Sequence, residues 1–120
     1  MSQSIWSYRP EAGYLDGADL VGYHVEAEDG RIGRVDAATP EADEGYLVVD
    51  TGPWIFGKQV LIPVGAVSRI DAEHETVHLD RTRDDVKNAP EFSYEQHLGD
   101  ADYRDRLGAY YGGLYGFPFV

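Results

Sequence analysis

Short runs of apolar residues in the middle of the chain predict β-strands. The most strand-like runs are residues 46–49 and 60–62, and a loop punctuated by glycine and proline joins them, which predicts a hairpin at the centre of the core. Residues 46–49 are apolar at four consecutive positions, so both faces of this strand should be covered. We expect Leu47 and Val49 to face one layer and the other two residues to face another.

A second hairpin is predicted before this one. Val21, Tyr23 and Val25 alternate along the chain and should share one strand face. The dipeptide Asp29-Gly30 that follows is a strong signal for a tight turn, and residues 31–37 then form the returning strand.

The returning strand does not alternate strictly. Ile32 and Val35 are three positions apart, so a regular strand would place them on opposite faces. A bulge at Gly33 would return Val35 to the inner face, as happens where a small sheet curls. Such a bulge is therefore expected here.

A last hairpin, residues 68–71 and 76–80, places Val77 and Leu79 inward. In total about six closely spaced strands are expected, with no helix between them. This pattern predicts an all-β fold, a small six-stranded antiparallel-type β-barrel.

The C-terminal quarter of the chain has helical signals instead. Thr82 and Asp85 have capping-box spacing before a single helical turn at 84–88 that Pro90 should stop. Short amphipathic helices are expected from residue 93 and over residues 100–111, the second with Tyr103, Leu107 and Tyr110 or Tyr111 on one face. The glycine-rich and aromatic end of the chain is expected to be neither helix nor strand.

Three segments follow from this pattern. Residues 1–18 form an irregular aromatic arm, residues 19–90 form the barrel, and residues 91–120 form short helices and an aromatic tail that packs on the barrel or on a second subunit. The arm is too aromatic for a disordered tail, so it should lie on the domain or on a neighbour.

Composition narrows the possible partners and locations. A formal net charge of −12 would repel phosphate backbones, so nucleic acid is not an expected partner. No apolar run reaches the roughly 20 residues of a membrane span. The N-terminus has no signal-peptide pattern and the chain has no cysteine, so we expect a soluble cytoplasmic protein.

Candidate chemistry is sparse. A metal site can be drawn from His74 and His78 with their acidic neighbours, but His78 should face solvent and His74 lies at a turn tip, so we interpret the arrangement as incidental. The acidic pairs cluster at turns, and the glycines do not have phosphate-loop spacing. We predict no catalytic residue, no metal and no cofactor, and hence no enzyme.

Large apolar residues outside the strands are the candidate interaction residues. Trp54, Ile55 and Phe56 lie at the tip of the central hairpin, where they need cover. Either the chain's own arm and tail pack there, or a protein partner or second subunit does. The same alternatives apply to the aromatic residues at the end of the chain: Tyr110, Tyr111, Tyr115, Phe117 and Phe119.

Residues 19–90 also resemble a known family, the PRC-barrel family, which is named for the cytoplasmic domain of the photosynthetic reaction-centre H subunit and is shared with a ribosome-maturation factor. The residues that match are Leu20-Val21-Gly22, Asp29-Gly30-Arg31-Ile32-Gly33-Arg34-Val35, Leu47-Val48-Val49, Ile62-Pro63, Val67, Val77-His78-Leu79 and Pro90. The resemblance implies a small six-stranded barrel without a common catalytic residue, used for assembly, docking or regulation.

Taken together, these observations predict a non-enzymatic assembly or protein-interaction module that forms a homodimer or binds a protein partner. The alternative is a small β-barrel protein that binds a small ligand or a metal, at the barrel mouth or at a His/Glu site.

Overall fold

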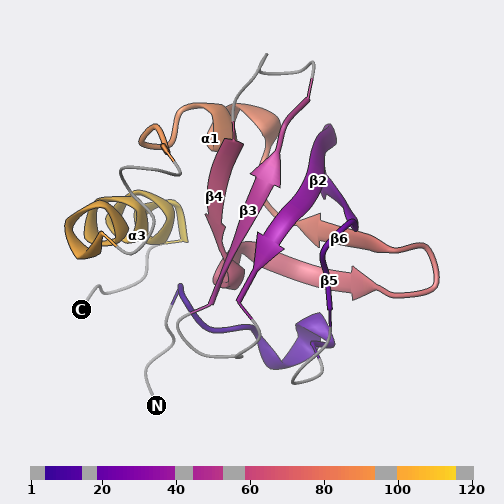
Figure 1. The fold of residues 1–120 in the computed structure, drawn as a ribbon. Helices are drawn as coiled ribbons and strands as arrows, with labels where there is room; N and C mark the ends of the chain where they lie inside the picture. Colours follow the sequence, from indigo (N-terminus) through magenta and orange to yellow (C-terminus); the bar gives the residue numbers. More distant parts are fainter. Residues whose placement is uncertain (1–4, 15–18, 40–44, 53–58, 94–99, 116–120) are drawn as a thin grey trace.

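Six strands form one curved sheet around the core in the computed structural model (Figure 1), which describes residues 5–14, 19–39, 45–52, 59–93 and 100–115. The strands are β1 (His24–Ala27), β2 (Gly30–Ala38), β3 (Tyr46–Asp50), β4 (Gln59–Pro63), β5 (Val67–Asp71) and β6 (Thr76–Leu79). The helices are the 3-10 turns η1 (Pro10–Ala12) and η2 (Val64–Ala66) and the α-helices α1 (Arg83–Lys87) and α3 (Ala101–Tyr115). The six predicted strands are confirmed.

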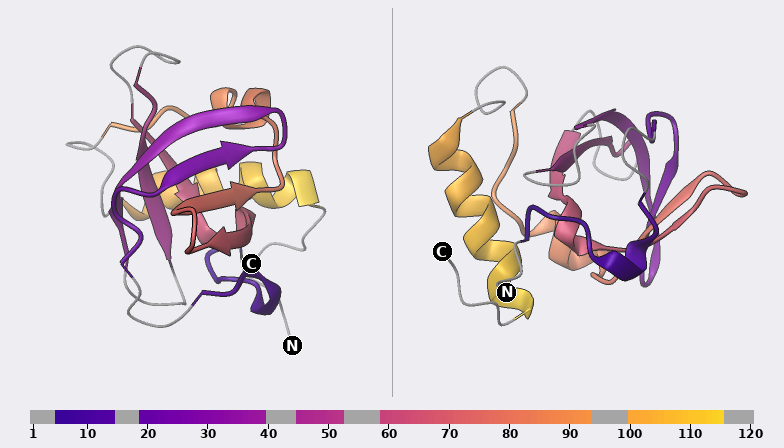
Figure 2. Two further views of the ribbon diagram at one scale, coloured as in Figure 1. Left: turned by 90° about the vertical axis from the view of Figure 1, so that its right-hand side faces the viewer. Right: turned by 90° about the horizontal axis from the view of Figure 1, so that it is seen from below.

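The order of the strands corrects the prediction of a closed antiparallel barrel. The order is β4-β3-β2-β1-β6-β5, and the β1–β6 pair is parallel while the other four pairs are antiparallel. The sheet is mixed, and within the described residues its end strands β4 and β5 form no ladder with each other. The fold is therefore an open, curled, mainly β sheet with two C-terminal helices (Figure 2).

The N-terminal segment pairs with the corner of the sheet between β4 and β5. The chain turns sharply from β4 into β5 through η2, and the backbone of Gly65 in that turn pairs with the N-terminal segment. Gly65 N–H donates to the Ile5 carbonyl at 2.7 Å, and its own carbonyl accepts from Arg9 Nε at 3.0 Å. These backbone groups are thus satisfied without a ladder between β4 and β5.

The predicted bulge in β2 is confirmed. In the β1–β2 pair Val25 lies opposite Gly33 while Glu26 lies opposite Arg31, so Ile32 is the extra residue. A side chain at Gly33 would overlap the carbonyl oxygen of Asp50 on β3, so the bulge also requires a residue without Cβ at this point.

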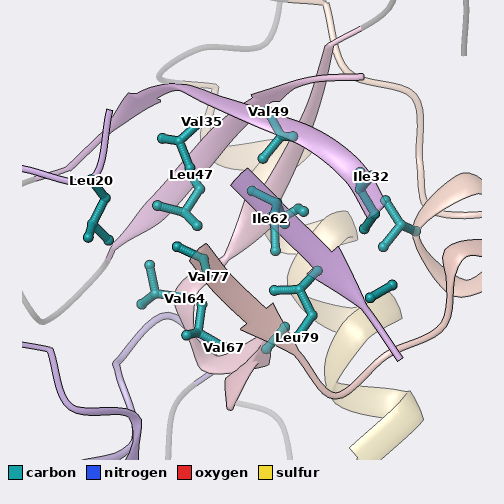
Figure 3. Packing of buried hydrophobic residues seen from close by; sticks show 14 of the residues in the cluster. Leu20, Ile32, Val35, Leu47, Val49, Ile62, Val64, Val67, Val77 and Leu79 are labelled. Atoms are coloured by element: carbon teal, nitrogen blue, oxygen red, sulfur yellow. The ribbon is translucent and has the colours of Figure 1, made fainter. Parts of the chain in front are cut away.

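The core lies inside the curve of the sheet (Figure 3). The bulge allows Ile32 and Val35 to be buried together, at 1% and 2% exposure. Leu47 and Val49 point into the same core, while the neighbouring Val48 is fully buried on the opposite face of β3. Both faces of β3 are therefore covered, as predicted.

The first strand begins later than expected. Val21 was predicted to face inward but is 52% exposed, whereas Leu20 is 2% exposed and belongs to the core. The cause is a turn: Tyr23 N–H donates to the Leu20 carbonyl at 3.0 Å, and Gly22 between them has φ +91°, which favours glycine. The strand starts only after this turn, at His24.

Two of the three helical predictions after the sheet fall on described residues, and both are confirmed with changed bounds. The helix predicted from residue 93 falls on residues 94–99, which lie outside the described residues. The Thr82 hydroxyl accepts from Asp85 N–H at 3.1 Å and the Asp85 carboxylate accepts from Thr82 N–H at 3.2 Å, so the predicted capping box begins α1. In the C-terminal helix Tyr103, Leu107 and Tyr111 share the buried face, as predicted. The helix continues to Tyr115, which corrects the expectation that the chain is irregular after residue 111.

Candidate functional site

The outer face of β3 and β4 is covered by α3 (Figure 2). Tyr103, Leu107 and Tyr111 of the helix pack with Leu61 of β4 and with Ile5, and each of these five side chains is at most 3% exposed. Partly buried residues extend this second core: Trp6, Tyr46, Ala89, Phe92, Tyr110 and Tyr115. The described aromatic residues of the C-terminus therefore pack on their own chain.

Ile5 and Trp6 of the N-terminal segment lie between the sheet and α3. Trp6 carbonyl accepts from Gly45 N–H at 2.6 Å, which ties the segment to the start of β3. On its other side the Trp6 ring packs against Gly108 of the helix and lies beneath Arg104, whose guanidinium carbon is 4.6 Å from the ring centroid. Residues 5–14 thus lie on the domain itself, one of the two positions expected for the arm.

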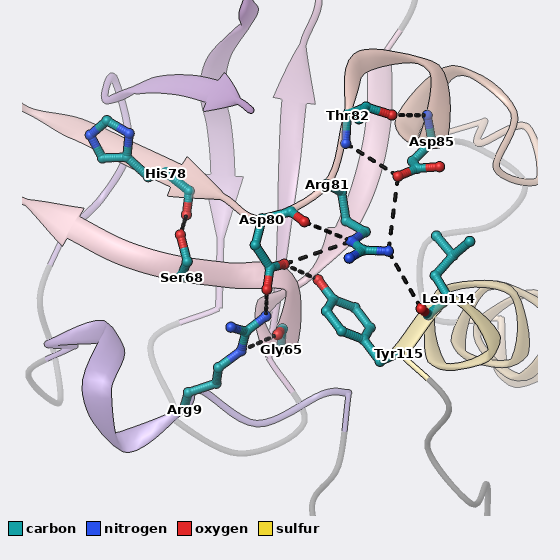
Figure 4. Close-up of polar contacts among 10 residues, drawn as sticks. All are labelled: Arg9, Gly65, Ser68, His78, Asp80, Arg81, Thr82, Asp85, Leu114 and Tyr115. Atoms are coloured by element: carbon teal, nitrogen blue, oxygen red, sulfur yellow. Dashed lines mark hydrogen bonds and ion pairs between the residues drawn. The ribbon is translucent and has the colours of Figure 1, made fainter. Parts of the chain in front are cut away.

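One carboxylate, that of Asp80 just after β6, connects the sheet with the N-terminal segment and with α3 (Figure 4). Arg9 of the N-terminal segment donates to Asp80 from Nη2 at 2.7 Å, and the Tyr115 hydroxyl at the end of α3 donates to the other carboxylate oxygen. The Arg9 and Asp80 side chains are 21% and 30% exposed, so solvent screens this ion pair less than a surface pair. We call this cluster, formed by Arg9, Asp80, Arg81 and Tyr115, the Asp80 junction.

Arg81, the second arginine of the Asp80 junction, contacts the Tyr115 ring and the end of α3. The guanidinium carbon of Arg81 is 4.4 Å from the centre of the Tyr115 ring, and that of Arg9 is 5.3 Å away. Arg81 Nη1 also donates to the Leu114 carbonyl at 3.5 Å, which places a positive charge at the C-terminal end of α3. The junction therefore fixes the end of the helix that covers the sheet.

A comparison with protein-family models identifies the domain. The model described as PRC-barrel domain matches residues 13–86, more than half of the chain. The chain belongs to the PRC-barrel family. A search of curated proteins finds no match. The resemblance noted in the sequence is thereby confirmed, and α3 and most of the N-terminal segment lie outside the matched part of this PRC-barrel chain.

Five tyrosines of this chain, all outside the part matched by the PRC-barrel model, have pKa values shifted by packing. Burial raises the pKa of Tyr8, Tyr103, Tyr110, Tyr111 and Tyr115 above the usual value, because the charged form would lose its hydration. These tyrosines are neutral at physiological pH. General acid-base catalysis instead needs a group whose pKa lies near the working pH.

The three histidines in the described residues, His24, His74 and His78, do not assemble into a metal-ligand set. His74 Nδ1 lies 2.8 Å from Asp71 Oδ2, and this hydrogen bond lowers the pKa of the Asp71 carboxyl. His78 Nε2 lies 3.1 Å from Arg69 Nη2, a cation that competes with any metal. Within the described ranges, no three His, Cys, Asp or Glu side chains are grouped as a metal site would need.

The predicted interaction residues divide into two groups. Tyr110, Tyr111 and Tyr115 are in α3 and contact the rest of their own chain; Tyr110, for example, donates to the Asp85 carbonyl at 2.6 Å. The other predicted residues lie outside the described residues: Trp54, Ile55, Phe56, Phe117 and Phe119. Among the predicted interaction residues that the structure describes, the helical tyrosines lie together.

Sequence reasoning missed the Asp80 junction and the contacts of Ile5 and Trp6. Arg9 and Asp80 are 71 positions apart, and no sequence pattern links them. A signal for the helical part did exist, since Tyr103, Leu107, Tyr111 and Tyr115 recur at intervals of four, a period typical of one helix face.

A small recess of about 210 Å³ lies along the outer side of β4. Val60 and Leu61 of the strand form one wall, and Val86 and Phe92 contribute to the other. Because β4 is an end strand of the sheet, this recess adjoins backbone that no further strand of the described chain pairs with.

Among the helices described, none is long and apolar enough to cross a membrane.

Proposed function

We propose that this PRC-barrel chain is a non-enzymatic interaction module that assembles by protein contacts, in the first place with a second copy of itself. The observation that supports this best is that its described aromatic residues are packing residues. In the described chain the tyrosines of α3 form, with Trp6, Tyr46 and Phe92, a packed aromatic cover held by the Asp80 junction, and these helical tyrosines are kept neutral within it. Membership of a family that is generally non-catalytic agrees with this proposal.

The contact surface is assigned to the loop between β3 and β4. The tyrosines of α3 are engaged within their own chain, so they are not free to serve as anchors without releasing the helix. Trp54, Ile55 and Phe56 remain the candidates, because large aromatic and aliphatic side chains are typical anchors of interfaces. The recess beside β4 begins at Gln59, directly after this loop, and would extend the contact.

Light scattering at increasing protein concentration tests this proposal. The full chain is expected to form a dimer, and a variant with Trp54→Ala and Phe56→Ala is expected to weaken the dimer by about thirtyfold or more, the effect of losing interface hot spots. Val21→Ala is the matched control, since it also removes an exposed apolar side chain, at 52% exposure, from another part of the surface.

The proposal of self-assembly fails if the full chain remains a monomer at every concentration, or if the loop variant dimerises as tightly as the control. Deleting residues 93–120 is a less specific test of the loop. That deletion removes α3 and uncovers Leu61 and its neighbours. The oligomeric mass and the solubility of the shortened chain would then change for a reason unrelated to Trp54. A deleted chain with unchanged mass and solubility would nevertheless count against any role of the aromatic tail.

A further inference from the structure

A second concave site lies away from the aromatic cover, where β1 and β2 meet the end of β3. This pocket has a volume of about 360 Å³, within the range of small-molecule sites. Ile32 and Thr51, both 1% exposed, form part of its wall. His24, Arg31 and Arg34 also line it, so two arginine side chains can donate hydrogen bonds as cations and one imidazole lies beside them.

The sheet register brings the polar lining together. His24 of β1 lies opposite Arg34 of β2, and Arg34 lies opposite Asp50 of β3. Their sequence neighbours Val25 and Val35 are buried in the core, so this row of polar side chains is on the outer face. Residues directly opposite in a sheet are close neighbours, so the row borders one site on three strands.

Arg34 differs from the other arginines of this acidic protein. The other arginines make an ion pair, a hydrogen bond or a ring contact: Arg9, Arg31, Arg69, Arg81, Arg83, Arg104 and Arg106. Within the described part of the chain, the Arg34 side chain makes none of these, although the protein has 22 acidic residues. Its guanidinium group is therefore available to an external anion.

The neighbours of Arg34 differ in how open they are to a ligand. His24 is half-buried, and its Nδ1 atom is buried without a hydrogen-bond partner within the described ranges, so this nitrogen is not accessible to a ligand in the pocket. Asp50 is the one acidic residue in the lining, and its Oδ1 accepts from Gly52 N–H at 2.9 Å. Arg31 Nη2 donates to Glu26 Oε2 at 3.0 Å, so Arg31 is already part of an ion pair.

We propose that this pocket binds a small molecule through an oxyanion, either a carboxylate or a phosphate group, held by Arg34 with His24 and Arg31 beside it. The planar fork of arginine matches both groups in a bidentate manner. The net charge of −12 opposes a polyanion, so the ligand is a small molecule and not a nucleic acid. This site is independent of the proposed assembly through the loop at 53–58.

The probes that test the site are succinate and inorganic phosphate, titrated into the isotope-labelled full chain at constant ionic strength with chloride as the reference anion. Amide signals of His24, Gly33, Arg34 and Gly52 are expected to shift with saturation. If succinate binds more tightly the natural ligand is a carboxylate, and if phosphate does it is a phosphate; equal affinity indicates a general oxyanion site.

Arg34→Gln is expected to weaken binding at least tenfold, and Arg34→Lys to weaken it less, because lysine keeps the charge without the fork. The matched control is Arg69→Gln, which removes the same charge from an exposed arginine on β5 and should leave the affinity unchanged. An unchanged melting temperature shows that each variant is folded. Shifts no larger than those of chloride, or equal weakening by Arg34→Gln and Arg69→Gln, overturn the proposal.

Discussion

Two tyrosines of α3 are equally buried but differ in what their hydroxyl groups meet. Tyr103 and Tyr111 are both 0% exposed. The Tyr103 hydroxyl donates to the Pro90 carbonyl at 2.9 Å, whereas the Tyr111 hydroxyl is buried without a hydrogen-bond partner in the described chain. A buried hydroxyl without a partner costs free energy, while a satisfied one contributes about 1 kcal/mol. The two residues should therefore respond differently to loss of the oxygen atom.

Tyr111→Phe is expected to leave the free energy of unfolding unchanged or to raise it, because the ring stays packed and an unpaired hydroxyl is removed. Tyr103→Phe is expected to lower it by about 1 kcal/mol, because the Pro90 carbonyl loses its donor. Urea denaturation of both variants beside the wild-type protein measures the difference. Equal losses in the two variants would show that the hydroxyl of Tyr111 also has a partner.

Asp80 is the residue on which the junction depends. Asp80→Asn is expected to lower the free energy of unfolding by about 1–3 kcal/mol, because the hydrogen bonds from Arg9 and Tyr115 lose their charged acceptor. The control is Asp105→Asn, which removes the same charge from an exposed position of α3 and is expected to have little effect. Chemical denaturation measures both, and similar values for the two variants would mean that the Asp80 junction contributes nothing specific.

The length of α3 shows why element boundaries were harder to predict than element types. Gly112-Gly113 disfavours a helix by about 1 kcal/mol for each glycine, which is why an irregular tail was expected after residue 111. Tertiary contacts outweigh this preference, because Tyr111 is buried, Tyr115 bonds to Asp80 and Arg81 binds the Leu114 carbonyl. None of these contacts is local in sequence.

The same helix provides a test at two glycines. A methyl group at Gly113 would meet no atom within 4 Å, so Gly113→Ala is expected to stabilise the protein by about 0.5–1 kcal/mol through helix propensity and a less flexible unfolded chain. At Gly108 a Cβ would lie 3.0 Å from Trp6 Nε1, so Gly108→Leu should displace Trp6 and cost about 1–3 kcal/mol. Thermal unfolding compares the two, and a gain at Gly108 would contradict the packing of Trp6 on α3.

For the whole molecule, the sequence indicates the sheet better than it indicates what covers the sheet. Alternation, the Asp29-Gly30 turn and the bulge at Gly33 are local signals, and they predict the strands and the inward side chains. The parallel β1–β6 pair and the open corner at η2 depend on partners far apart in the chain, so local patterns do not specify them. In the candidate site, the tyrosine face of α3 could be predicted, whereas the contacts of Arg9 and Asp80 could not.

The buried tyrosines also predict how stability depends on pH. Their pKa values are raised by burial, so above pH 10.0, the ordinary value for tyrosine, the unfolded chain releases protons that the folded chain retains. Stability is therefore unaffected by these groups below that pH and falls as pH rises toward the folded pKa values, by about 1.4 kcal/mol per pH unit for each protected tyrosine.

Urea denaturation between pH 8 and about pH 11 measures this loss, and absorbance at 295 nm follows tyrosine ionisation in the folded protein. Several of the nine tyrosines should ionise only when the protein unfolds. Ionisation of all nine near pH 10, with the fold retained, would contradict the burial of the aromatic cover. The Tyr111→Phe variant should show a shallower loss than the wild-type protein.

The central claim is that α3 and the N-terminal segment cover the outer face of β3 and β4 within one chain, whatever the oligomeric state of the protein. The most direct measurement uses an equal mixture of isotope-labelled and unlabelled protein, in which nuclear Overhauser effects within a chain are separated from those between chains. We predict that contacts from Tyr103 and Tyr111 ring protons to Leu61 and Ile5 methyl groups appear only within a chain. The same contacts observed between chains would show that the helix is exchanged between protomers, and would contradict the account.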